Sequence, residues 1–395
     1  MGLLFPTVLQ AGQIINIDTN LTDVSPTGNG TPPYGSEPYD LTPDGIRGNT
    51  VNINAGVTVG RGVRGVLVPV VTPGLIVTKN EVNVYGTVND NVSGAWTIFS
   101  NITDVLHNTV NIFGTGIVND RVVGGRGNPE RSVGYNKVNV YNGGTVINST
   151  GAAIVGGSSS SNLVIGNEVT IDGGIIKGDI YGGEIDIEFS NLKNAKITGN
   201  VVTIKGRTSI DGDIYGGRYT GDGPFMGDAF TGNTLNIDNF DSSFRLPDAP
   251  LINLRSLYNF EFYNFTVPHT QTGPVITPYR ALLSGSKINV AVTGSPVPDA
   301  ETFLKNLVLI DTNGYIIDMP STVKATVGGE SYILNLNPDG TVASVTENRP
   351  NGGSGGGGGG GCNSFGAFGL SAIIFLASIY NRRRVTKDGI QNGEK

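Results

Sequence analysis

The chain is poor in the residues that build disulfides, metal sites and catalytic centres. Cys362 is its only cysteine, so no intrachain disulfide can form and the core must hold without one. The two histidines, His107 and His269, lie far apart in the sequence and in no metal-ligand spacing. A nucleophile turn and a phosphate-binding glycine loop ahead of a helical segment are also missing. These absences predict a protein that is not an enzyme and uses no cofactor or metal ion.

An excess of positive charge is lacking as well. The formal net charge is −7, which argues against nucleic acid as a partner. Periodic runs of helix-forming residues are almost absent before residue 299, whereas glycine supplies 60 of the 395 residues. This composition predicts an all-β fold.

What the sequence does contain is a phrase that recurs seven times, with an asparagine followed by alternating apolar and polar residues. Each copy, such as NTVNI or NKVNVY, has the period-two pattern of a short strand. Successive copies start 28 to 33 residues apart, at Asn49, Asn80, Asn108, Asn136, Asn167, Asn200 and Asn233. So narrow a spacing indicates a structural repeat of about 30 residues.

A unit of this length cannot bury its own apolar face, so we expect the units to stack as the coils of a β-solenoid (β-helix). The leading asparagines would then form a side-chain ladder between coils. Glycine pairs downstream, as in VVGG and IYGG, are expected to supply positive φ angles where strands turn. An antiparallel β-sandwich or barrel array is the alternative architecture. If the solenoid is correct, one interior ladder contains Val51, Val82, Val110, Val138, Val169, Val202 and Leu235.

The repeats suggest the domain boundaries. Residues 1–47 read as an irregular leader, 48–250 as the solenoid of about seven coils, and 251–349 as a mostly-β cap. A solenoid end needs such a cap because it exposes unpaired backbone. Within the cap, PDAETFLK predicts a short helix that starts near Asp299. The first residues, MGLLFPTVLQAGQ, lack a basic start and a long apolar core, so we expect a truncated gene product without its export signal.

The C-terminal residues have the pattern of a targeting signal. A Gly-rich linker at 350–363 precedes an apolar segment with an arginine cluster at 364–384, and residues 385–395 form a predicted cytoplasmic tail. The apolar stretch is at the short edge of what spans a bilayer, and the arginines mark its cytoplasmic side. The alternative is an ordinary single-pass anchor. The residues expected to matter for sorting or processing are Gly360, Gly361, Cys362, Asn363, Arg382, Arg383 and Arg384.

This tail resembles the Synergist-type variant of the C-terminal sorting signals of Gram-negative bacteria, with Gly-Gly-Cys-Asn ahead of the helix. The resemblance implies processing by a rhomboid-like sortase, a membrane partner, and display at the cell surface or outer envelope. The repeats resemble the passenger regions of autotransporter and haemagglutinin-like surface proteins, although no C-terminal membrane barrel follows them. That resemblance implies an adhesin-like or structural role, with host or envelope glycans or proteins as partners.

One pair of residues repeats closely enough to suggest a site. The phrase GDIYGG occurs twice and would place Asp179 beside Asp213, and Tyr181 beside Tyr215, on adjacent coils. Paired carboxylates can hold a cation or act as acid and base, and tyrosines can face a sugar ring. A glycan-binding or glycan-cleaving β-helix, of the polysaccharide lyase or hydrolase kind, is therefore the alternative function. The simpler interpretation is that the repeat copies these residues without a functional demand.

Overall fold

The computed structural model describes a series of segments between residues 14 and 348. Residues 349–395 lie outside the described residues, so the predicted linker, apolar segment and tail are not seen. Among the residues that the structure does describe, no helix is long and apolar enough to cross a bilayer. The described ranges are 14–22, 47–68, 76–97, 104–127, 132–160, 163–186, 194–221, 225–239, 254–294, 299–312 and 314–348.

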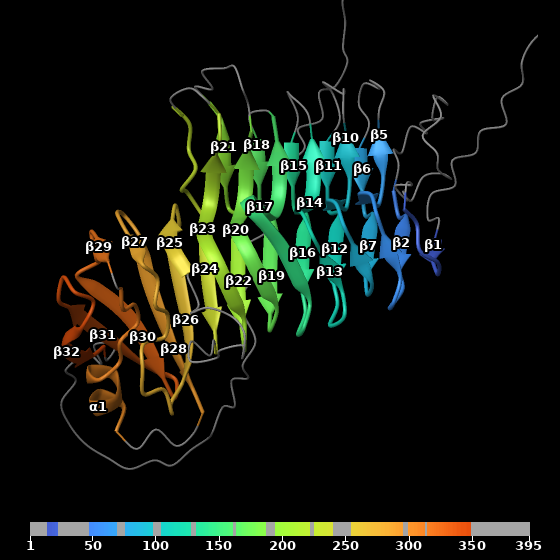
Figure 1. The fold of residues 1–395 in the computed structure, drawn as a ribbon. Helices are drawn as coiled ribbons and strands as arrows, with labels where there is room; N and C mark the ends of the chain where they lie inside the picture. Colours follow the sequence, from blue (N-terminus) through green and yellow to red (C-terminus); the bar gives the residue numbers. More distant parts are fainter. Residues whose placement is uncertain are drawn as a thin grey trace, which may run out of the picture. The chain divides into compact units, whose positions relative to one another are not determined.

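The seven asparagine phrases form neighbouring strands of one sheet, here called sheet A (Figure 1). The strands pair in parallel and in register, which confirms the β-solenoid of about seven turns and excludes the antiparallel array. Val51 pairs with Val82, and the ladder continues as predicted through to Leu235, with every member fully buried. The strands are β2 (Thr50–Ile53), β7 (Glu81–Val84), β12 (Thr109–Ile112), β16 (Lys137–Val140), β19 (Glu168–Asp172), β22 (Val201–Lys205) and β24 (Thr234–Asp238).

Sheet A extends beyond the seven coils at both ends. Strand β1 (Ile14–Ile17), within the predicted leader, pairs in parallel with β2. At the other end β26 (Phe262–Pro268), β28 (Lys287–Thr293) and β30 (Thr322–Val327) continue the parallel stack, and the buried rings of Tyr263 and Phe265 fill its core. Among the described strands of sheet A, only β31 (Glu330–Leu336) runs against the stack, and β32 (Val342–Glu347) pairs antiparallel with β31. The parallel stacking therefore runs well into the predicted cap.

The predicted helix in the cap is present as α1 (Ala300–Lys305). Asp299 is its N-cap, and the aspartate side chain accepts a hydrogen bond from the backbone N–H of Thr302 at 2.9 Å. This bond satisfies one of the orphan donors of the first turn. Leu304 is buried and attaches the helix to the core.

Sheet B and, in five of the seven coils, sheet C complete the coils among the described residues, and the chain visits the sheets in the order C, A, B. Sheet C contains β6 (Ile76–Thr78), β11 (Asp104–Leu106), β15 (Ser132–Gly134), β18 (Leu163–Ile165) and β21 (Lys196–Thr198). Sheet B starts as the short strands β3 (Thr58–Val59), β4 (Val63–Arg64), β5 (Leu67–Val68), β8 (Thr87–Val88), β9 (Val92–Ser93), β10 (Trp96–Thr97), β13 (Ile117–Val118) and β14 (Val122–Gly127). It continues as β17 (Thr145–Ser159), β20 (Ile175–Ile185), β23 (Ser209–Tyr219), β25 (Leu254–Tyr258), β27 (Arg280–Leu282) and β29 (Tyr315–Ile317).

The coils enclose two apolar cores. The larger lies between sheet A and those residues of sheet B that come first in each coil, with side chains such as Val138 and Ile154. The smaller lies between sheet C and those residues of sheet B that come last in each coil. Its side chains include Val133, Val164 and Ile185. Successive strands pair in parallel along the whole stack, so each coil covers the core of the one before it.

The leading asparagines form a buried amide ladder, as predicted. The Nδ2 of Asn108 donates to the Oδ1 of Asn136 at 3.0 Å, and Asn136 donates to Asn167 in the same way, also at 3.0 Å. Each Oδ1 also accepts the backbone N–H of the preceding asparagine, as for Asn108 and Asn136 at 3.0 Å. The ladder links all seven asparagines without a gap.

The ladder ends at Asn233, whose Nδ2 donates to the backbone carbonyls of Ile197, Ala229 and Asn259. Phe260, which is fully buried, packs into the next coil. A second ladder, on the outward side of sheet A, joins asparagines that are at least partly exposed except for Asn111, and it donates in the opposite direction. Its members in the first coils are Asn16, Asn52, Asn83, Asn111 and Asn139.

The glycine pairs have a different reason from the predicted one. Gly124, Gly125 and Gly156 are not among the residues with positive φ. A Cβ on Gly125 would instead lie 2.7 Å from the side-chain amide of Asn136, and one on Gly156 would overlap the carbonyl oxygen of Gly182. The pair lets the backbone of sheet B lie directly against the amide ladder, so close approach requires the glycines here.

Candidate functional site

The two copies of GDIYGG lie on the outward side of sheet B, in β20 and β23. Tyr181 pairs with Tyr215 in the register of these strands, so the residues are neighbours on adjacent coils, as the sequence predicted. The backbone N–H of Asp213 donates to the Oδ1 of Asp179 at 2.9 Å, which brings the two aspartates together.

The carboxylates of Asp179 and Asp213 already accept hydrogen bonds from within the protein. The hydroxyl of Tyr181 donates to the Oδ2 of Asp179 at 3.1 Å, and that of Tyr215 to the Oδ2 of Asp213 at 3.4 Å. Among the described residues, no group of three His, Cys, Asp or Glu side chains is arranged to hold a metal ion. The Asp–Tyr pairs therefore contribute to the outward packing of sheet B.

The two tyrosine rings offer little surface to a sugar. Tyr181 is 5% exposed and Tyr215 7%, and their rings meet edge to face with centroids 5.2 Å apart. Tyr215 also stacks on Tyr258 at 4.7 Å. Burial, followed for Tyr181 by the charge of Asp179, raises the pKa of both hydroxyls well above the usual value of tyrosine. Both rings thus belong mainly to a small apolar cluster on this face.

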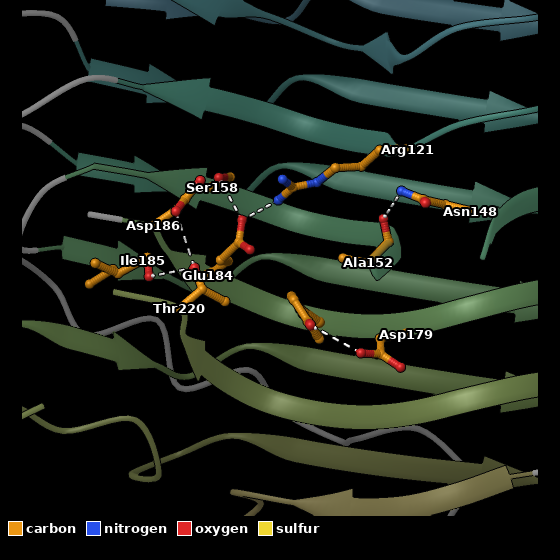
Figure 2. A network of polar contacts seen from close by, with 10 residues as sticks. Arg121, Asn148, Ala152, Ser158, Asp179, Glu184, Ile185, Asp186 and Thr220 are labelled. Atoms are coloured by element: carbon orange, nitrogen blue, oxygen red, sulfur yellow. Dashed lines mark hydrogen bonds and ion pairs between the residues drawn. The ribbon is translucent and has the colours of Figure 1, made fainter. Parts of the chain in front are cut away.

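A pocket of about 270 Å³ lies beside Asp179, which is the one predicted residue that lines it. Its wall includes a bulge in β17, where the pairing with β20 shifts register between Ile147 and Ala152. Asn148 holds the bulge, because its Nδ2 donates to the carbonyl of Ala152 at 3.1 Å (Figure 2) and its Oδ1 accepts the backbone N–H of Thr150 at 3.2 Å. The lining residues are Ser149, Thr150, Gly151, Lys177, Gly178, Asp179, Asp211, Gly212 and Arg255.

The pocket is polar and carries both signs of charge. Arg255 lies 3.5 Å from the carboxylate of Asp211, and 65% and 39% of their side chains are exposed. Lys177 pairs with Asp211 in the register of β20 and β23. Exposed groups of both signs can form hydrogen bonds with a polar ligand such as a sugar. Sequence reasoning missed this pocket, although the NSTG turn signal in the middle of a strand-like run could have indicated the bulge.

A second cluster on this face, also missed, surrounds Glu184. The side chain is 3% exposed, and its carboxylate accepts hydrogen bonds from the guanidinium of Arg121 and from the hydroxyl of Ser158 at 2.9 Å (Figure 2). These donors compensate a buried charge that would otherwise be costly. A comparison of the two repeats, IYGGE and IYGGR, shows that Glu184 and Arg218 occupy equivalent positions, and this difference was the signal available in the sequence.

The predicted sorting residues, from Gly360 to Asn363 and from Arg382 to Arg384, lie outside the described residues. No protein-family model matches the chain, and no curated protein or solved structure shows significant similarity to it. What is established for this chain is therefore the solenoid fold and the geometry of the outward face of sheet B.

Proposed function

We propose that the chain is a cell-surface repeat protein of adhesin-like role, which binds a partner through the outward face of sheet B and performs no catalysis. The observation that carries this proposal is one row on the outward face of sheet B, which changes chemistry at almost every coil. One outward row of sheet A, by comparison, keeps asparagine from Asn16 to Asn139. In register, the row of sheet B consists of Leu67, Trp96, Arg126, Ser158, Glu184 and Arg218.

Three members of this row, Trp96, Arg126 and Arg218, are partly exposed, whereas the other three are buried. Varied side chains that are partly exposed on a rigid scaffold can be specific for a ligand. The neighbouring pocket adds a concave polar feature on the same sheet. The C-terminal sequence supports display, because a glycine-rich linker, an apolar segment and arginines follow the solenoid. The proposal thus includes a membrane partner, a rhomboid-like sortase and an envelope or host glycan or protein as ligand.

The test is a binding screen of the purified full chain against neutral and acidic polysaccharides and host matrix proteins. Binding that leaves the polysaccharide intact is the expected result. If the chain binds nothing in such a panel, a structural role as a surface spacer becomes the better description.

A glycan-cleaving activity is the second candidate, and the pocket favours it because Asp179 and Asp211 both lie on its wall. Release of reducing or unsaturated ends from a polysaccharide, abolished by Asp179→Asn or Asp211→Asn, would establish it. Against this candidate, both oxygens of Asp179 already accept hydrogen bonds from Tyr181 and from the backbone of Asp213.

A further inference from the structure

Four arginines, three in the first coils and one in the sixth, lie along the outward face of sheet B. Arg64 lies in the coil before Trp96 and Arg126 in the coil after it, and their guanidinium carbons lie 4.2 Å and 5.0 Å from the centre of the indole ring. Arg121 immediately precedes β14, the strand of Arg126, and Arg218 continues the row three coils further on. This cationic cluster occurs in a chain whose net charge is −7.

The indole ring of Trp96 orients the two guanidinium groups that stack on it. Cation–π stacking fixes the plane of a guanidinium and leaves its N–H groups at the edge. Because arginines from the coils on either side engage the ring, Trp96 is not a platform for a sugar ring. Its role is to hold Arg64 and Arg126 in position.

Two of these cations lack a carboxylate partner among the described residues. Glu184, the buried acid of this face, is bound by Arg121 and Ser158. No carboxylate of the described segments lies within ion-pair distance of Arg126 or Arg218, and the Nε of Arg218 is buried without a hydrogen-bond acceptor. Burial, and then the charge of Arg121, lowers the pKa of the Arg126 guanidinium.

Glu184 and Asp186 act on Arg126 only from beyond ion-pair distance. A partly buried guanidinium without a carboxylate in direct contact is costly for a fold to keep. Arginine forks match the planar geometry of carboxylate groups and the oxygens of sulfate groups. Arg126 and Arg218 are three strand steps apart, about 14 Å at the usual strand spacing. Only an extended ligand with repeated negative charges reaches both.

We propose that Arg126 and Arg218, with Arg64 held on Trp96, bind an acidic polysaccharide that lies across the coils on the outward face of sheet B. The inference rests on the proposed binding role and adds the class of ligand and the residues that bind it. The site is separate from the pocket beside Asp179. Carboxylate-bearing and sulfate-bearing polymers share the required chemistry.

Trp96 makes the test direct, because it is the only tryptophan of the chain and lies within the proposed site. The purified full chain is titrated with polygalacturonate, chondroitin sulfate, dextran, inorganic sulfate and a single-stranded oligonucleotide while the tryptophan emission is recorded. Both acidic polysaccharides should change the emission saturably, and the more effective one identifies the anionic group. Neutral dextran should have no effect, and inorganic sulfate should act only at much higher concentration.

Variants locate the binding. Arg126→Gln and Arg218→Gln should each weaken binding of the better polysaccharide at least tenfold, whereas Arg126→Lys should weaken it less. Lys324→Gln, which removes an exposed charge from the outward side of sheet A in β30 (Thr322–Val327), is the control and should leave the affinity unchanged. Arg255→Gln tests the pocket as the alternative location. Circular dichroism establishes that the variants fold, and the wild-type titration tests the proposal if one of them does not.

Several outcomes would overturn the inference. No saturable change with either acidic polysaccharide, an equal response to dextran, or stronger binding of the oligonucleotide would each contradict it. Binding that is lost in Arg255→Gln but kept in the other variants would move the ligand to the pocket. In that last case the proposed binding function would stand while the assignment to the arginines would fail.

Discussion

Replacing Asn136 by alanine removes one rung from the middle of the buried amide ladder. The Oδ1 of Asn136 accepts the backbone N–H and the side-chain amide of Asn108, both at 3.0 Å. Its Nδ2 donates to the carbonyl of Val105 and to the Oδ1 of Asn167, again at 3.0 Å each. The substitution therefore removes four hydrogen bonds and leaves the backbone N–H of Asn108 and the carbonyl of Val105 without this partner. The Nδ2 of Asn108 still donates to the carbonyls of Val77 and Leu106, and the Oδ1 of Asn167 still accepts the backbone N–H of residue 136.

The magnitude follows from the two backbone groups that lose their partner. At about 1–2 kcal/mol each, because water can enter the space that the amide leaves, the free energy of unfolding should fall by about 2–4 kcal/mol. The matched control is Asn139→Ala, three residues further along in β16. The side-chain amide of Asn139 is partly exposed and donates to the Oδ1 of Asn111 at 2.9 Å. Because water replaces this bond, the control should cost about 0.5–1 kcal/mol.

Urea unfolding followed by circular dichroism and by Trp96 fluorescence measures both values. Equal destabilisation by the two substitutions would refute the reasoning, because it would mean that burial of the inner ladder adds nothing. A larger effect of Asn139→Ala would refute it more strongly.

Three other predictions concern glycine, pH and the tail. Gly156→Ala should lower stability by more than about 3 kcal/mol because the new methyl group overlaps the Gly182 carbonyl, whereas thermal unfolding of Gly151→Ala, at an open position, should be almost unchanged. Stability should fall as pH rises above about 10, where unfolded tyrosines ionise while the raised pKa of Tyr181 and Tyr215 keeps them neutral in the fold; unfolding of the Tyr181→Phe/Tyr215→Phe double variant should depend less on pH in that range. Mass spectrometry of the mature surface protein should find no peptide of residues 375–382, and its presence would identify a permanent anchor.

The solenoid could be predicted because the seven repeats within the chain can be aligned with one another. Seven copies fixed the strand register, so the ladder from Val51 to Leu235 and the asparagine ladder followed directly. The continuation of sheet A beyond Asn233 was harder to predict, since β26 and β28 keep the strand period but replace the leading asparagine. Tyr263 and Ile288 carry the interior position there.

The contacts of the outward face could not be derived in the same way. Arg121 and Glu184 are 63 residues apart and come from coils that are not adjacent in sequence, so their ion pair depends on side chains crossing an intermediate coil. The glycine pairs were predicted for positive φ, but their cause is the approach of sheet B to the amides. A sequence position that requires glycine does not reveal which of these two demands acts on it.

The two asparagine ladders also determine the electrical character of the stack. In the inner ladder each amide donates to the following coil, as Asn108 does to Asn136. In the outer ladder each donates to the preceding coil, as Asn139 does to Asn111. Side-chain amides carry substantial dipoles, and two ladders with the same direction would build an axial dipole that grows with every added coil. In the coils from Asn52 to Asn139, which carry both ladders, the two dipoles oppose each other and largely cancel. The next two coils have Thr170 and Thr203 in the outer row, so only the dipole of the inner ladder remains there. Repeats that carry both asparagines can therefore be gained or lost without a growing electrostatic penalty.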